Sequence, residues 1–277
     1  MRRLVAAGLV IIAMLAALVT LPMVWVASHL ADEDGYVAFT SPMGSDPELQ
    51  KAFSAYLSDY FVSELGLPSS LQPSAASVLG AAAATTANAP GFTTAWEESQ
   101  RRSHRLMFGP NANQDRLAID LSPLAKFTAA NVGKGLPVAL PEPGKIVLQV
   151  NDTSQREAID QISATKDRSR IGWIVVAAAA ALSLVFAKRR STGLVWLGVG
   201  ALGVAAALKA ASSYGVPNIL DKTPAPSGFA RTLQKLLADR AADSFAQTLL
   251  WVAIAGIAAI VVGLLLRASS GRKRLAA

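Results

Sequence analysis

Four long apolar stretches without a charged residue constrain this chain more than any other feature of its sequence. They cover Leu4–Ala27, Ile171–Ala187, Gly193–Leu208 and Leu249–Leu266. A helix needs about 20 apolar residues to cross the ~30 Å hydrocarbon core of a bilayer. Because lipid offers no hydrogen-bond partners, the backbone of such a stretch must bond to itself. The sequence therefore predicts four transmembrane helices, the middle two being completed by flanking residues.

The composition supports this assignment and excludes several kinds of chemistry. Hydrophobic residues make up 52% of the chain and charged residues only 16%, whereas charged residues alone make up about a quarter of typical soluble domains. The chain contains no cysteine. Disulfides, thiolate metal sites, cysteine nucleophiles and iron–sulfur clusters are therefore excluded.

The distribution of charge predicts an orientation in the membrane. All 19 acidic residues lie in two segments, 28–170 and 209–248. The basic residues outside these segments have no acidic neighbour: Arg2, Arg3, Lys188, Arg189, Arg190, Arg267, Arg272, Lys273 and Arg274. Segments rich in Lys and Arg stay in the cytoplasm. Both termini and the short basic turn are therefore expected there, and the net charge of +7 requires no nucleic-acid partner.

Tryptophan positions fit the same arrangement. Trp25, Trp173 and Trp251 lie at the expected outer ends of three apolar stretches, and Trp196 lies near the inner end of the remaining one. Indole rings favour the membrane–water interface because they have an apolar body and a polar N–H. We expect these four residues at interfaces; only Trp96 lies away from one.

The first apolar stretch has a second interpretation, a cleaved signal peptide. Arg2 and Arg3 would form its basic start, and Val26-Ala27-Ser28 its small-residue cleavage site. The apolar core of a signal peptide is only about 7–15 residues long, far shorter than Leu4–Ala27. We therefore expect a retained helix and keep cleavage as the alternative.

Two helices are expected in the first half of segment 28–170. Ser45 and Glu48 fit a capping box at the start of a helix over Ser45–Gly66. Thr94–Phe108 begins with the same capping pattern and ends at a Gly-Pro pair. The Ala-, Ser- and Thr-rich segment between them, 69–90, fits either a helix of small residues or a linker.

Strands are expected in the second half of the same segment. Arg116–Leu121 alternates as a half-buried strand does, and Lys145–Val150 is a second strand candidate. Ser122 and Pro123 are expected to cap a short helix that ends near Val132. Asp152 caps a further helix that leads through residue 162 toward the second apolar stretch.

The second polar segment, 209–248, is expected to be irregular first and helical later. Pro217, Pro224 and Pro226 interrupt its first half. Ser227 can cap a helix whose apolar residues share one side: Phe229, Leu233, Leu236 and Leu237. Such a helix either packs on the protein, which we favour, or lies on the bilayer surface.

These features together predict a membrane α-helical fold with four transmembrane helices, plus a helix-rich α/β extracytoplasmic domain between helices 1 and 2. The predicted parts are an N-terminal anchor, the outer domain, a helical hairpin with a basic cytoplasmic turn, a second outer loop with an amphipathic helix, and a last helix with a basic cytoplasmic tail. Their ranges are 1–27, 28–170, 171–211, 212–247 and 248–277.

A series of motifs between Trp96 and Ala211 carries a resemblance. Its members are Ile119-Asp120-Leu121-Ser122-Pro123, Ile146-Val147-Leu148, Ile171–Ala187, Lys188-Arg189-Arg190 and Gly193–Leu208. In this stretch the chain resembles a group of uncharacterised actinobacterial four-helix integral membrane proteins with an extracytoplasmic domain. The resemblance implies a membrane protein of the cell envelope and implies no mechanism.

One glycine motif has two interpretations. Gly198-Val-Gly200-Ala-Leu-Gly203 matches the G-x-G-x-x-G pattern of dinucleotide-binding loops, and Asp221 follows near the spacing of a ribose-binding acid. The βαβ units of such a domain are not indicated around it. We predict close helix packing and no nucleotide. Small residues at every fourth position predict the same for Ala179, Ser183 and Ala187, and for Ala255, Ala259 and Gly263.

No residue is predicted to be catalytic, cofactor-binding or metal-binding. His29 and His104 are the only histidines, and neither has the spacing of a metal ligand set. Gly133-Lys134 lacks the earlier glycine of a phosphate-binding loop. Two acidic pairs are interpreted as solvated faces: Asp32 with Asp34, and Glu97 with Glu98.

We therefore predict a non-enzymatic integral membrane protein of the bacterial inner membrane. It would be an accessory or scaffold subunit whose outer domain contacts another envelope protein, with no cofactor, nucleotide or nucleic acid. One alternative is a membrane subunit of a transporter or channel, although no ionisable residue lies at the centre of a span. The second is an envelope enzyme, for which His104, Asp120 and Ser122 are the first residues to test.

Overall fold

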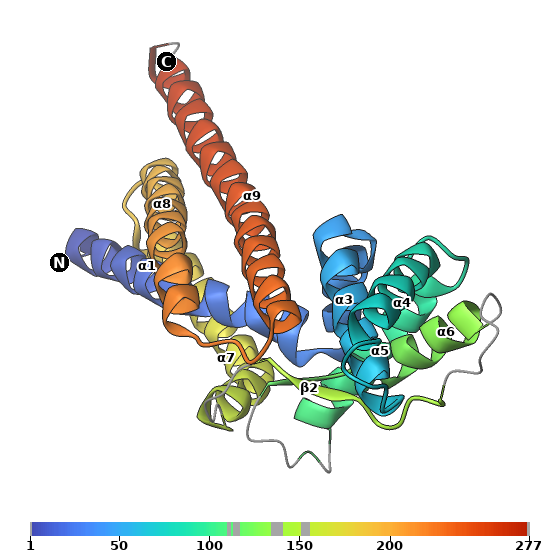
Figure 1. The fold of residues 1–277 in the computed structure, drawn as a ribbon. Helices are drawn as coiled ribbons and strands as arrows, with labels where there is room; N and C mark the ends of the chain where they lie inside the picture. The colour runs from blue at the N-terminus through green and yellow to red at the C-terminus, as the bar shows by residue number, and fades with distance from the viewer. Residues whose placement is uncertain (1, 110–111, 113–116, 134–140, 151–155, 276–277) are drawn as a thin grey trace. The chain divides into compact units, whose positions relative to one another are not determined.

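The computed structural model describes residues 2–109, 112, 117–133, 141–150 and 156–275, and these are mostly helical (Figure 1). The chain divides into two compact units. The first, here called the span unit, comprises Met1–Ala27, Ala164–Asn218 and Arg240–Ala277. The second, here called the globular unit, comprises Ser28–Ser163 and Ile219–Asp239.

Four helices are long and apolar enough to cross a membrane, as the sequence predicts. They are α1 (Arg2–Val26), α7 (Arg156–Phe186), α8 (Arg190–Lys222) and α9 (Gly228–Leu275). Their candidate spans are Leu4–Ala31, Arg156–Phe186, Arg190–Gly215 and Gly228–Ser269. The first span includes a π-helical turn, Ala27–Ala31, that continues α1.

Exposed apolar side chains are concentrated on these four helices. Among the described residues, every large hydrophobic side chain that is highly exposed belongs to the span unit, except Leu71 and Val78. Leaving apolar surface in water costs roughly 25 cal/mol per Å². A surface of this kind is therefore suited to contact with lipid.

Glycines let α8 approach its neighbours closely. A Cβ atom on Gly198 would lie 2.5 Å from the Gly256 carbonyl oxygen of α9. A Cβ on Gly200 would lie 2.9 Å from the Met14 Sδ of α1. On α9, a Cβ on Gly263 would lie 2.7 Å from a methyl group of Val195. The prediction that the G-x-G-x-x-G segment serves helix packing is confirmed.

The other small-residue stripes are only partly confirmed. Ala179 and Ser183 of α7 are buried. On α9, Ala255 is exposed, and its neighbour Gly256 makes the contact with α8 instead. On α9 the expected stripe is therefore confirmed at Gly263 and replaced by Gly256 at its first position.

Trp25 differs from the interface anchor that its position predicts. Its side chain is buried, its Nε1–H donates to Ser244 Oγ at 3.1 Å, and its ring meets the edge of Phe245. By contrast, Trp173, Trp196 and Trp251 are exposed. Trp25 therefore joins α1 to α9, and the other three remain candidates for interface anchors.

The globular unit contains helices and one very small sheet. Its elements are α2 (Glu33–Thr40), a 3-10 turn (Ser41–Ser45), α3 (Pro47–Glu64), α4 (Gln72–Thr86), α5 (Phe92–Phe108), β1 (Ala118–Asp120), α6 (Ser122–Val132) and β2 (Val147–Gln149). β1 and β2 are antiparallel, and Ile119 pairs with Leu148. Segment 69–90 is thus helical over most of its length. Within the described residues the strands are much shorter than expected.

The helix α3 is capped by a different residue from the one predicted. Ser45 lies in the 3-10 turn, and Asp46 is the N-cap. The Asp46 carboxylate accepts the backbone N–H groups of Glu48 and Leu49, at 2.8 and 3.0 Å. Proline is favoured at the first helical position. Pro47 takes that position and thereby makes the preceding residue the cap.

The capping box expected at the start of α5 is also absent. The helix begins at Phe92, two residues before Thr94, and its N-cap is Gly91 with φ +95°. Glycine adopts this left-handed conformation without steric cost. Glu97 instead accepts a hydrogen bond from Ser41 Oγ at 2.6 Å.

Helix α7 joins the helix expected around residue 162 to the second span, as predicted, whereas α8 and α9 are longer than the predicted segments. Pro217 lies inside α8, which ends at Lys222, so irregular backbone is confined to the short segment around Pro224 and Pro226. Ser227 caps α9 through its Oγ, which accepts the Ala230 N–H at 3.1 Å. The predicted amphipathic helix and the fourth span form one helix. The predicted cap Asp152 lies outside the described residues.

The core of the globular unit includes the first turns of α9. Phe229 and Leu233 are buried, and Phe229 stacks on Tyr56 of α3 with ring centroids 5.7 Å apart. Trp96 and Leu57 are buried in the same cluster. This start of α9 therefore packs on the protein, which is the alternative that we favoured.

Candidate functional site

Two serines of α5 fix the backbone of the elements that follow. Ser103 Oγ accepts the Asp120 N–H at 2.9 Å and donates to the Ser99 carbonyl oxygen at 2.5 Å. Ser99 Oγ accepts the Leu124 N–H at 3.3 Å. Both serines are fully buried. Buried polar groups generally have such partners, so these hydroxyls position the end of β1 and the start of α6.

Asp120 and Ser122 continue this buried network. Asp120 Oδ1 accepts the Ser122 N–H at 2.9 Å, and Ser122 Oγ accepts the Ile146 N–H at 2.9 Å. The two side chains thus hold the turn between β1 and α6 against the residue that precedes β2.

His104 lies elsewhere in the globular unit, among aromatic rings. Its Nε2 lies 3.2 Å from the Leu30 carbonyl oxygen, and its ring contacts Tyr36 and Phe108. Tyr36 donates its hydroxyl to Gln100 Oε1 at 3.1 Å. Burial raises the pKa of Tyr36, so its phenol stays protonated and acts as the donor.

His104, Asp120 and Ser122, which the sequence analysis proposes for a catalytic test, therefore each form a hydrogen bond with a backbone group. Ser99 and Ser103 were not singled out from the sequence. The sequence feature that could have indicated them is the presence of two hydroxyl groups four residues apart, on the apolar face of an otherwise highly charged helix.

An ion-pair cluster joins α2 to α5 at the surface. Glu33 Oε1 lies 3.0 Å from Arg101 Nη1 and 2.8 Å from Arg105 Nη2, and Asp34 Oδ1 lies 2.9 Å from Arg101 Nη1. The hydrogen bond from Arg105, with a smaller effect of Arg101, lowers the pKa of Glu33 from its ordinary 4.5 to about 2 against the opposing effect of burial. Glu33 thus stays ionised well into the acidic range.

The acidic pairs interpreted as solvated faces also serve the fold. Asp32 caps α2 by accepting the Gly35 N–H at 3.1 Å. Glu98 pairs with Arg102 one helical turn later, at 2.8 Å. Within the described residues no group of three or more His, Asp or Glu side chains could hold a metal ion. Lys134 lies outside the described residues.

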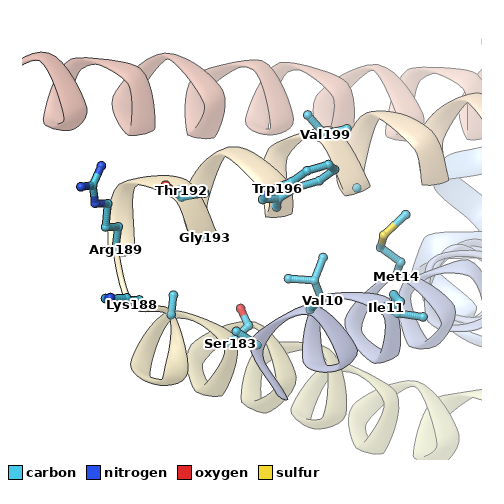
Figure 2. A pocket seen from close by; sticks show the side chains of 14 residues that line it. Val10, Ile11, Met14, Ser183, Lys188, Arg189, Thr192, Gly193, Trp196 and Val199 are labelled. Carbon is cyan, nitrogen blue, oxygen red and sulfur yellow. The ribbon is translucent and has the colours of Figure 1, made fainter. Parts of the chain in front are cut away.

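The span unit contains a large apolar cleft (Figure 2). It has a volume of about 770 Å³ and is lined by α1, α7, α8 and the turn between α7 and α8. Val10 and Met14 of α1 lie across it from Trp196 of α8. Lys188 and Arg189 lie at one end, on the turn. Sequence reasoning missed this cleft because a cleft depends on how three helices pack.

Comparisons with known proteins identify no relative. No family model matches the chain, and no curated protein and no solved structure is similar to it.

Proposed function

We propose that this chain is a multi-pass protein of the bacterial inner membrane whose globular unit lies outside the cytoplasm. The observation that carries the proposal is the confinement of exposed large apolar side chains to the four long helices, with Leu71 and Val78 as the exceptions among the described residues. Lipid is the solvent that suits such a surface. The basic termini and the basic turn support an orientation with these segments in the cytoplasm.

Contacts of α1 support its retention as a helix of the mature protein. Val10, Ala13 and Leu21 are buried. A Cβ on Gly172 of α7 would overlap Thr20, which shows how closely these two helices approach. Cleavage after the first span would remove these contacts, so a retained helix is favoured over a signal peptide.

The proposed role of the globular unit is to contact another envelope protein, without catalysis. Its candidate catalytic side chains are occupied in holding the fold. Its exposed large apolar residues within the described range are Leu71 and Val78. Leu71 is the N-cap of α4, and Val78 lies in the second turn of this helix. Apolar side chains exposed singly are common, so α4 is a starting point for mapping. We also propose that the chain is a member of the actinobacterial group that it resembles.

Cysteine labelling in intact cells tests the orientation, because the chain has no cysteine of its own. Ser63→Cys places an exposed thiol on α3, and Ser269→Cys places one near the end of α9. A membrane-impermeant maleimide should label the first variant in intact cells and the second only after permeabilisation. The reverse pattern, or labelling of both without permeabilisation, would refute the proposed orientation.

Site-specific photo-crosslinking tests the proposed partner contact. A photo-reactive residue at Val78 should give a crosslink to a second envelope protein in living cells. The same residue at Ser63 is the matched control on another exposed helix of the globular unit. If neither Val78 nor Leu71 crosslinks to another protein, the scaffold role of α4 is wrong.

A further inference from the structure

The cleft in the span unit has the size and lining of a site for an elongated apolar molecule. Its volume of about 770 Å³ falls within the roughly 300–1,000 Å³ of typical small-molecule sites. Apolar or small side chains from three helices form its walls, including Ala6, Val10, Met14 and Trp196. An acyl chain would meet apolar atoms on all of these walls.

The charge at one end of the cleft specifies the other part of the ligand. Lys188 and Arg189 are exposed residues that line this end (Figure 2). Neither forms an ion pair with any acidic side chain in the part of the chain that the structure describes. None of the residues lining the cleft is acidic. The turn thus offers an ammonium and a guanidinium group to an anion.

Each cation suits phosphate in its own way. Arginine can donate two parallel hydrogen bonds to phosphate oxygens, and lysine acts as a compact point charge. Basic pockets between transmembrane helices bind anionic lipid headgroups in this manner. A free phosphate ion would leave the apolar walls unfilled, and a zwitterionic lipid would bring no net negative charge to the turn.

We infer that the cleft binds one anionic membrane phospholipid, with an acyl chain between α1, α7 and α8 and the phosphate against Lys188 and Arg189. This inference rests on the proposed insertion of the span unit into a bilayer. It adds a lipid site of stated chemistry, on the same leaflet as the basic turn.

Trp196 lines the cleft, and a lipid bound there would quench it in addition to the bulk lipid that reaches its exposed ring. The full chain carrying Trp25→Phe, Trp173→Phe and Trp251→Phe retains Trp196 and the buried Trp96, which is 1% exposed and serves as an unquenched reference. The protein is reconstituted into phosphatidylcholine vesicles that contain a minor fraction of either brominated phosphatidylglycerol or brominated phosphatidylcholine. Bromine on an acyl chain quenches an indole that it contacts.

Brominated phosphatidylglycerol should quench Trp196 at a roughly tenfold lower mole fraction than brominated phosphatidylcholine, because each basic residue near a headgroup favours an anionic lipid. Lys188→Gln with Arg189→Gln should abolish this preference. Lys209→Gln with Lys222→Gln removes the same charge from exposed positions that do not line the cleft, and should leave the preference intact.

A second pair of variants tests the apolar part of the site. Ala7→Phe places a ring in the cleft and should reduce quenching of Trp196 by both lipids. Ala258→Phe adds the same ring at an exposed position of α9 and should not.

Equal quenching by the two lipids, or equal loss of preference in both double-glutamine variants, would overturn the inference. Flotation of the vesicles separates this failure from failure of the proposed function. Protein that floats with the vesicles but shows no preference refutes the lipid site alone. Protein that does not float refutes membrane insertion itself.

Discussion

Ser122 Oγ accepts the backbone N–H of Ile146 in a buried position. The variant Ser122→Ala removes the acceptor and leaves that N–H unsatisfied, which costs about 1–3 kcal/mol. Thermal unfolding of the purified protein in detergent should show the loss. Ser63→Ala is the matched control, because Ser63 is exposed and its hydroxyl bonds only within its own helix. Equal stability of Ser122→Ala and the unaltered protein would contradict the assigned role.

Glu33 gives a prediction about pH at the same scale. Its folded pKa of about 2 lies below its ordinary 4.5, so its contribution is present above pH 4.5 and is lost as the pH falls through the folded pKa. At neutral pH, Glu33→Gln should lower stability by about 1 kcal/mol, because the side chains of this cluster are partly exposed. The difference from the unaltered protein should shrink as the pH falls from 4.5 toward 2.

Melting temperatures of the two proteins across this pH range provide the measurement. Glu98→Gln disrupts a more exposed pair within a single helix and should have a smaller effect at neutral pH. If the difference in melting temperature between Glu33→Gln and the unaltered protein stays constant down to the lowest pH, the contacts of Glu33 with Arg101 and Arg105 do not contribute to stability.

At the scale of helices, the contact between α8 and α9 depends on Gly198. Gly198→Ala would place a methyl group 2.5 Å from the Gly256 carbonyl oxygen. Because that oxygen belongs to a helix backbone, it can move only with α9, and such overpacking costs about 1–3 kcal/mol. Gly203→Ala is the control on the same helix, since its Cβ would meet only Met14 Cε at 3.8 Å. In detergent, the melting temperature of Gly203→Ala should be higher than that of Gly198→Ala. Equal melting temperatures would contradict the packing argument.

Which parts of the fold are predictable from sequence depends on the range of the interactions that determine them. The four apolar helices follow from local composition, and so does the extent of α6, Ser122–Val132, although its N-cap is Leu121 and not the predicted Ser122. Helix starts were predicted less well, because Ser45 and Asp46 are both good N-caps and Pro47 decides between them. The helix that starts after Ser227 and the fourth span are both predicted, but the sequence analysis treats them as separate segments, whereas they form one helix, α9.

The candidate sites were less predictable than the helices. The roles of Asp120 and Ser122 depend on α5 and on residue 146, which are distant in the sequence. The cleft requires three helices to pack around a space, and the only local signal for it is the basic turn beside apolar stretches. Neither arrangement leaves a periodic pattern in the chain.

At the scale of the whole molecule, the exposed apolar side chains of the span unit predict behaviour in solution. Removal of detergent should cause the purified protein to aggregate, because the large apolar side chains of all four helices would face water. Light scattering after dilution below the critical micelle concentration is the measurement. A chain that stays monodisperse without detergent or lipid would contradict the membrane assignment.

The very small sheet of the globular unit has a consequence for the order of folding. Three residue pairs join β1 to β2, and an isolated two-stranded ribbon is at best marginally stable in water. Ser103 of the preceding helix supplies an acceptor for the Asp120 N–H, and Ile119 and Leu148 are buried in the core of the globular unit. In pulsed hydrogen exchange during refolding, we expect the Asp120 amide to gain protection no earlier than the amides of α5, so that the helix serves as the template on which the ribbon assembles.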